Sequence, residues 1–99
     1  MHTVIRRYEG VGDTAEVARR AVEEFGPILS DRPGFQGYWA IDAGNGVAAT
    51  ITVFDTEEQA TESIAAAAGW VSENMADLVP NPPQVTAGET TGIMAGAPA

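Results

Sequence analysis

The sequence predicts a single α+β domain in which strands and helices follow the order β-α-β-β-α-β. The segment 47–75 reads as a β-rich apolar run, a helix-start signal and a long helix with an apolar stripe. A similar strand and helix can be read in the first third of the chain, and 99 residues is the length of one small domain. We therefore expect a four-stranded antiparallel sheet with two helices on one face, formed by residues 1–92, and a loose C-terminal tail at 93–99.

The first strand is expected at Thr3–Glu9, which is rich in β-forming residues. Asp13 and Glu16 have the spacing of a helix N-cap and a carboxylate in the first helical turn. Apolar residues then recur every three or four positions to about Leu29, which predicts a helix with one apolar face. The Gly-Pro pair at 26–27 is expected to weaken or bend the last turn of this helix, because proline has no backbone N–H.

The second and third strands are expected to form a hairpin. Phe35–Asp42 and Val47–Phe54 have the alternating pattern of strands, and the Asn-Gly pair at 45–46 suits a tight turn with positive φ. Side chains of a strand point alternately to the two faces of a sheet. Strict alternation puts four residues of the second strand on one side of the sheet, namely Phe35, Gly37, Trp39 and Ile41.

The second helix has the clearest start and stop signals of the chain. Thr56–Gln59 has the pattern of a capping box, and the apolar stripe that follows extends to Leu78. Three prolines between positions 80 and 83 then end the helix. The fourth strand is expected at Gln84–Thr91, where Gly88 weakens the pattern.

The composition excludes several classes of function. Five basic and fourteen acidic residues give a formal charge of -9 at pH 7, and such a surface repels nucleic-acid phosphates and anionic membranes. The chain has no cysteine, which excludes disulfides, thiol nucleophiles and cysteine-based metal sites. The first ten residues also lack the apolar core of a secretion signal. We therefore expect a cytoplasmic protein that binds neither nucleic acid nor membrane.

Sequence motifs for cofactor or metal chemistry are missing as well. The chain has no phosphate-binding loop, no GxGxxG after a strand, no nucleophile elbow and no metal-ligand spacing. His2 is the only histidine, and we expect it at a frayed strand end. The helix predicted after Thr56 contains no histidine that could ligate heme iron. We therefore expect no metal and no cofactor.

The run GFQGYWAIDAGNGVAATITVFDTEEQATES leads into a helix that carries a tryptophan, and a closing strand follows a proline-rich turn. This pattern resembles the antibiotic biosynthesis monooxygenase-like domains of the dimeric α/β-barrel superfamily, over roughly Thr3 to Thr90. The resemblance implies a ferredoxin-like fold, a homodimer whose two sheets pack face to face, and a cleft between sheet and helices in each subunit. Members of the superfamily include cofactor-free quinol oxygenases, heme-degrading enzymes and muconolactone-type isomerases.

Four aromatic or amide residues are candidates for contact with a ligand. Trp70 and Asn74 share one face of the second helix, beside its apolar stripe, where they could line the mouth of a cleft. Some quinol oxygenases of the resembled family use Trp and Asn to hold the substrate. The alternative is that Trp70 only seals a dimer or helix-edge contact. Tyr38 and Trp39 are neighbours in a strand, so we expect one in the core under the helices and the other between two sheets.

Two adjacent arginines of the first strand are the remaining candidates. Arg6 and Arg7 must point to opposite faces, and an arginine that points inward needs an acidic partner or an anionic ligand. Glu9, Asp42 and Glu89 are acidic residues that could form a structural ion pair with it. We take Arg7 as the candidate for ligand binding and keep the ion pair as the alternative.

These observations leave two hypotheses for the function. The first is a small cofactor-independent monooxygenase that acts on, or binds, an aromatic, quinol-like molecule through Tyr38, Trp39, Trp70, Asn74 and Arg7. The second is a non-enzymatic ligand-binding or assembly domain on the same homodimeric scaffold, which the absence of an acid–base set favours. The sequence names no catalytic residue for either hypothesis.

Overall fold

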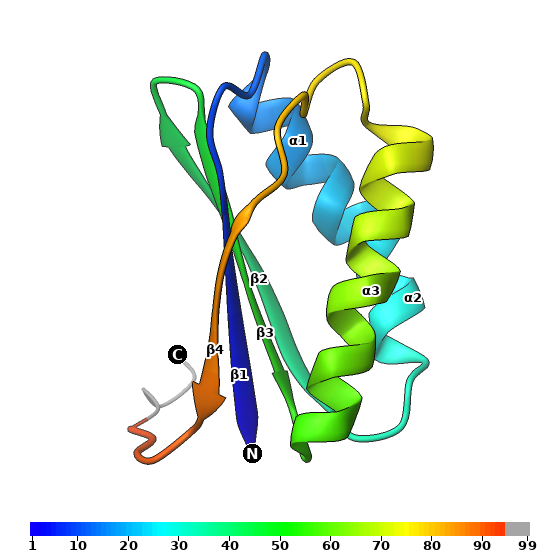
Figure 1. Cartoon of the computed structure of the whole chain (residues 1–99), viewed down its shortest axis with the longest axis vertical. Helices are drawn as coiled ribbons and strands as arrows, with labels where there is room; N and C mark the ends of the chain where they lie inside the picture. Colours follow the sequence, from blue (N-terminus) through cyan, green and yellow to red (C-terminus); the bar gives the residue numbers. More distant parts are fainter. Residues whose placement is uncertain (95–99) are drawn as a thin grey trace, which may run out of the picture.

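A computed structural model describes residues 1–94 and has two layers, a sheet and a pair of helical arms packed on one of its faces (Figure 1). In chain order the elements are β1 (His2–Tyr8), α1 (Thr14–Arg20), the π-helical turn η1 (Ala21–Phe25), α2 (Gly26–Ser30), β2 (Phe35–Gly44), β3 (Val47–Phe54), α3 (Glu57–Asn74) and β4 (Gln84–Glu89). The sheet is antiparallel with strand order β2-β3-β1-β4. The predicted ferredoxin-like α+β fold is therefore confirmed.

The predicted C-terminal tail is only partly described. Ile93 and Met94 are exposed, while residues 95–99 lie outside the described residues. The boundary placed after residue 92 stays a prediction.

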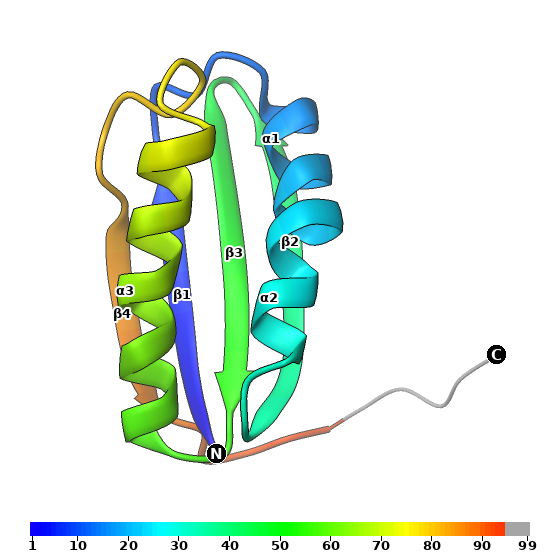
Figure 2. The ribbon, with the colours of Figure 1, turned by 90° about the vertical axis from the view of Figure 1, so that its right-hand side faces the viewer.

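The helices cover the two halves of one sheet face. Figure 2 shows α3 in front of β1 and the arm formed by α1, η1 and α2 in front of β2, with β3 behind the space between them. Residues of β1 and β3 that face these helices are buried, among them Val4, Arg6, Thr52 and Phe54. The core therefore lies between the layers, and no helix of residues 1–94 covers the opposite face of the sheet.

The first helical arm contains a wide turn, η1, directly before the Gly-Pro pair, where the sequence predicts only a weakened or bent last turn. Between α1 and α2, the Gly26 N–H donates to the Ala21 carbonyl, five residues earlier. Pro27 explains this, because it has no N–H and its ring crowds the carbonyl four residues before it. The chain accommodates the proline by widening the preceding turn, and π-turns of this kind are often found at functional sites. Ala21 and Phe25, at the two ends of this turn, are both buried.

One predicted strand face is wrong because of a β-bulge. The pairing between β2 and β3 shifts between Phe35 and Gly37, so Phe35 pairs with Phe54 while Gly37 pairs with Val53. A bulge inserts one extra residue into a strand. A side chain that precedes the bulge therefore points to the face opposite the one that strict alternation predicts. Phe35 therefore packs edge-on against Phe54 in the core, and does not share the outer face with Gly37, Trp39 and Ile41.

The local signals for helix starts and the hairpin turn are found in the structure. Asp13 accepts a hydrogen bond from the Glu16 N–H, and Thr56 and Gln59 form the reciprocal capping box. Positive φ occurs at Asn45 in the hairpin, as the sequence predicts. Helix α3 ends at Asn74, before Leu78, which is the last residue of its predicted apolar stripe.

Candidate functional site

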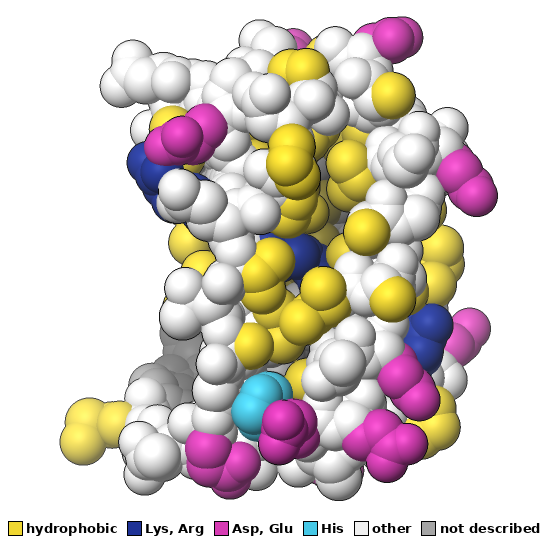
Figure 3. Space-filling model, in the orientation of Figure 1, with side chains coloured by type: hydrophobic (Ala, Val, Ile, Leu, Met, Phe, Trp, Pro, Cys, Tyr) yellow, Lys and Arg dark blue, Asp and Glu magenta, His cyan; other side chains and the backbone are white. Residues whose placement is uncertain are grey.

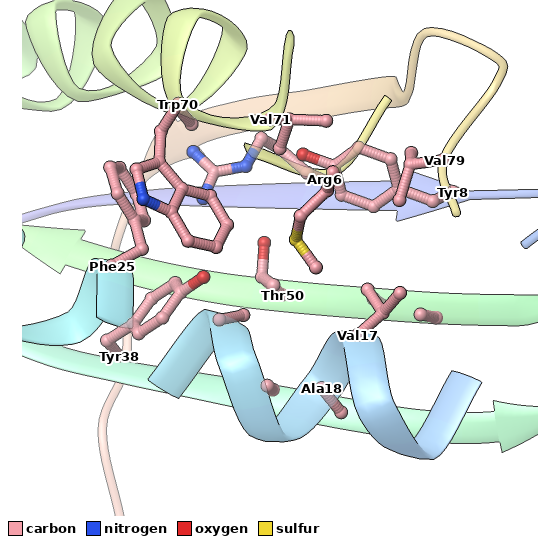
Figure 4. A pocket seen from close by; sticks show the side chains of 16 residues that line it. Arg6, Tyr8, Val17, Ala18, Phe25, Tyr38, Thr50, Trp70, Val71 and Val79 are labelled. Carbon is pink, nitrogen blue, oxygen red and sulfur yellow. The ribbon is translucent and has the colours of Figure 1, made fainter. Parts of the chain in front are cut away.

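A small cavity lies between the helix-covered face of the sheet and the two helical arms. The space open to the centre of a water molecule is about 20 Å³, which is room for about one water. Strands β1, β2 and β3 supply its floor, and α1, η1 and α3 supply its walls (Figure 4). The lining is mostly apolar, with Arg6, Tyr8, Tyr38 and Thr50 as its polar members.

Arg6 brings a permanent positive charge to this cavity. Strand alternation turns Arg6 toward the helices and Arg7 to the opposite face, so Arg6 is only 2% exposed. Its Nε and Nη1 have no hydrogen-bond partner. A guanidinium does not lose its proton in proteins, so the charge itself is buried. The acidic partner that we considered for an inward arginine is missing among the described residues.

Three hydroxyl groups point toward the guanidinium in Figure 4, those of Tyr8, Tyr38 and Thr50. Thr50 lies opposite Arg6 in the β1–β3 pairing, and its Oγ1 also has no hydrogen-bond partner. Burial raises the pKa of both tyrosines above its ordinary value, and the nearby charge of Arg6 offsets part of that increase. Both phenols therefore stay protonated at neutral pH and act as neutral hydrogen-bonding groups.

An aromatic wall borders the cavity on one side. Trp70 of α3 lies against Phe25, with ring centroids 5.3 Å apart and planes tilted by 32°. Phe25 also meets Tyr38 edge-on, with centroids 6.1 Å apart. Three aromatic rings from three elements thus form one surface that a flat ligand could contact.

The structure brings two of the five predicted site residues to this cavity, Tyr38 and Trp70. Trp39 is 54% exposed, and Arg7, which is also exposed, pairs with Glu9. Both belong to the side of the sheet without helices. Asn74 is exposed, and its side-chain amide donates to the Trp70 carbonyl at 2.9 Å. A ligand contact for these last three residues stays a prediction.

Sequence reasoning missed three polar residues of the site, Arg6, Tyr8 and Thr50. Arg6 and Tyr8 are two positions apart on one strand, so the alternation that separates Arg6 from Arg7 also puts them on the same face. Val4 is apolar and precedes Arg6 and Tyr8 on the same face of the strand, so it could have indicated which face of β1 is buried. The register that brings Thr50 opposite Arg6 has no local signal in the sequence.

An outer groove adjoins the cavity. It runs between α3, Tyr8 and the proline-rich turn at 80–83, and about 310 Å³ of it is open to water centres. Tyr8, Val71 and Val79 line both spaces and so lie between them. Figure 3 shows a hollow on this side of the molecule, between β4 and α3, that is lined by hydrophobic side chains and has a basic side chain in it.

No cluster of three or more His, Cys, Asp or Glu side chains within residues 1–94 could hold a metal ion. None of the helices described is long and apolar enough to cross a membrane.

Comparisons with known proteins give the fold but no family. No protein-family model and no curated protein matches the chain. Among solved structures, NE2512 of Nitrosomonas europaea, a protein of unknown function, is 21% identical with a TM-score of 0.75, covering 98% of this chain and 95% of its own.

Two similar structures contain ligands. A monooxygenase from the gene ActVA-Orf6 of Streptomyces coelicolor, in complex with nanaomycin D, is 13% identical with a TM-score of 0.73 and coverage of 97% and 92%. A variant of MhuD with two manganese protoporphyrin IX molecules bound per active site is 14% identical, with a TM-score of 0.72 and coverage of 97% and 100%. At such identities the likeness establishes a shared fold, which agrees with the fold that the sequence resemblance implies.

Proposed function

We propose that the chain is a small monooxygenase-like protein that binds a flat aromatic, quinol-like molecule between its sheet and its helices. The observation that carries the proposal is the aromatic wall of Phe25, Tyr38 and Trp70 beside the buried, unpartnered Arg6. An apolar site with a few convergent polar groups is the usual form of a small-molecule site. The nanaomycin complex of a monooxygenase with this fold supports the same class of ligand.

The reaction we propose uses the ligand itself as the reductant. In such a reaction a CH₂ group of an aromatic ligand becomes a carbonyl, one atom of O₂ enters the ligand, and the other leaves as water with the two hydrogens. The chain's part is to hold the ring away from water and to stabilise the ligand's electron-rich anion. Arg6 is placed to stabilise this anion, because a fixed positive charge in a dry site stabilises negative charge more than water does.

A porphyrin does not suit this site. The side chains that line the cavity and the outer groove include no histidine that could ligate a heme iron. We therefore do not extend the porphyrin binding of the MhuD variant to this chain.

We also propose a homodimer formed through the sheet face that has no helices. Its exposed apolar side chains lie on β1 and β2: Ile5, Trp39 and Ile41. A contiguous apolar patch of this kind marks an interaction surface. In this arrangement Trp39 is an interface residue, as the sequence analysis allows, and it lies on the face opposite the cavity.

One observation favours the second candidate, a binding domain without catalysis. Aspartate, glutamate and histidine are absent from the lining of the cavity, and burial keeps both of its tyrosines protonated. A site of this composition has no general base near neutral pH. Binding alone needs none.

Ligand-induced stabilisation followed by oxygen uptake tests the proposal and separates the two candidates. Purified protein is heated with two flat aromatics and with aliphatic molecules of equal size. The aromatics are anthrone, which has the CH₂ group that the proposed reaction oxidises, and naphthoquinol, which has two hydroxyls and no CH₂ group. At a ligand concentration of about 100 Kd the melting temperature should rise by roughly 10 °C. An oxygen electrode then shows whether the bound compound is consumed. Binding with oxygen uptake supports the monooxygenase, and binding without uptake supports the binding domain. If no aromatic compound raises the melting temperature, both are wrong.

A further inference from the structure

Arg6 differs from every other arginine of the chain. The other four are at least partly exposed, and each has a glutamate partner: Arg7 with Glu9, Arg19 with Glu16 and Glu23, Arg20 with Glu24, and Arg32 with Glu62. Arg6 is 2% exposed, and within residues 1–94 Nε and Nη1 of its guanidinium have no hydrogen-bond partner and its charge has no acidic partner. The chain has fourteen acidic residues, yet none of those in residues 1–94 forms an ion pair with Arg6.

An uncompensated buried guanidinium destabilises the protein that contains it. Its charge loses hydration, and nothing in the described chain replaces that loss with an opposite charge. Folding therefore tolerates Arg6 at a cost that an anion in the cavity would remove. Such a residue is expected where an anionic ligand supplies the missing charge.

The polar groups around Arg6 can hold an oxyanion but cannot create one. The guanidinium is a donor only, and the hydroxyls of Tyr8, Tyr38 and Thr50 can each donate to a negatively charged oxygen. Neither a carboxylate nor a histidine lines the cavity to take a proton from the ligand. A ligand must therefore reach this site already ionised.

The dimensions of the two adjoining spaces divide such a ligand into two parts. The inner cavity, with about 20 Å³ open to water centres, has room for one oxygen-sized group. The outer groove has about 310 Å³ and suits a ring system. Tyr8, Val71 and Val79 border both spaces, so a ligand that extends from the groove to Arg6 must displace part of this boundary.

We propose that the site selects flat aromatic acids that bind as monoanions, with the oxyanion at the Arg6 guanidinium, the ring that carries it against Trp70 of the aromatic wall, and the remaining rings in the outer groove. The inference rests on the proposed function, because it names the class of aromatic ligand that the same site takes. The oxyanion is either an enolate or phenolate, or a carboxylate. Either kind accepts charge-assisted hydrogen bonds from the guanidinium.

Four compounds in two matched pairs test the proposal on the unmodified full chain. 2-Hydroxy-1,4-naphthoquinone is an enolate at neutral pH, and its methyl ether is neutral. 2-Naphthoate is a carboxylate, and 2-naphthamide is its neutral counterpart. Titration calorimetry at pH 7.5 measures the affinity of each compound. In at least one pair the anion should bind on the order of 10–100-fold more tightly than its neutral counterpart. The pair with the larger ratio identifies the kind of oxyanion.

Three variants then assign the selectivity to Arg6. Arg6→Met should abolish the preference for anions, and its melting temperature should equal or exceed that of the unmodified chain, because a buried uncompensated charge is removed. A purely structural arginine would lower the melting temperature when replaced. Arg6→Lys keeps the charge without the fork, so it should keep only part of the preference. Arg19→Gln removes one exposed arginine charge that does not line the cavity, so this variant should keep the full preference for anions.

The outcomes separate this inference from the function on which it rests. If the neutral and anionic members of both pairs bind the unmodified chain equally well, the inference is wrong while aromatic binding stands. If anions are preferred but Arg6→Met or Arg6→Lys retains the full preference, the inference is also wrong. If none of the four compounds binds, the proposed function fails and the inference fails with it. The comparison within the unmodified chain needs no variant to fold.

Discussion

Trp70 of α3 lies against Phe25 of the π-turn, with ring centroids 5.3 Å apart, and this contact joins the two helical arms above the cavity. Trp70 packs against both of the hydrophobic clusters that make up the core. Phe25 in turn meets Tyr38 on the sheet. One aromatic chain therefore runs from α3 through η1 to β2, and it is at once part of the core and a wall of the site.

Phe25→Ala should lower the free energy of unfolding by roughly 3–5 kcal/mol. Phe25 is 2% exposed and contacts both other aromatic residues of the wall, so its removal leaves a cavity that neighbours fill poorly. Urea denaturation followed by circular dichroism gives the change. Val22→Ala on the same turn is the control, because Val22 is exposed and should cost far less. A loss below about 1 kcal/mol for Phe25→Ala would mean that the arm packs on the sheet in another way.

Trp70→Phe should weaken aromatic binding and should also lower the melting temperature, because Trp70 packs against both core clusters. A phenyl ring keeps part of the contact with Phe25 but covers less of a flat ligand. Asn74→Ala should weaken binding less, because the Asn74 amide donates to the Trp70 carbonyl and not into the cavity. Titration with the tightest compound found in the screen measures both effects. A Trp70→Phe variant that binds normally would remove Trp70 from the site.

The sequence predicts the elements of this protein well because their signals are local. Asp13, the capping box at Thr56 and the Asn45 turn depend on residues a few positions apart. The π-turn and the bulge after Phe35 are exceptions, since both insert a residue without changing the composition of the element. A single inserted residue is enough to reverse the face on which a side chain lies.

The site is predicted less well because it depends on facing and register. Arg6 and Arg7 point to opposite faces of one strand, and the sequence alone does not show which of the two faces the cavity. The prediction therefore named Arg7 where the structure has Arg6. Thr50 lies opposite Arg6 only through the β1–β3 pairing, which joins residues 44 positions apart. Trp70 could be chosen because a helix face is defined by near neighbours.

Light scattering at micromolar concentration should give about twice the mass of one chain if the open sheet face forms the proposed dimer. Ile41→Asp should shift the protein to the monomer, because Ile41 is 43% exposed on that face and a charge would be buried between two sheets. Ile28→Asp is a matched control: Ile28 is 46% exposed, but it lies on α2. A monomer for the unmodified chain, or equal dissociation by both variants, would contradict the proposed interface.

The two tyrosines of the cavity should make the protein lose stability in alkaline solution. Burial raises the pKa of Tyr8 and of Tyr38 in the folded state, so the unfolded chain loses these protons first as the pH rises past the ordinary value of about 10. Stability is therefore full below that pH and falls as the pH rises toward the folded pKa, by up to ~1.4 kcal/mol per pH unit for each tyrosine.

The composition of the chain makes this effect easy to isolate. It contains two tyrosines, no lysine and no cysteine, so few other groups titrate near pH 10. Urea denaturation between pH 8 and pH 11, in steps of about half a unit, gives the slope, and tyrosinate absorbance of the folded protein gives the pKa directly. The slope of the free energy of unfolding against pH should become smaller in Tyr8→Phe, which keeps one of the two buried tyrosines. The double variant with Tyr38→Phe should show almost no slope. If the folded protein forms tyrosinate at the pH of free tyrosine, the hydroxyls are exposed to water, and the dry polar cavity around Arg6 does not exist.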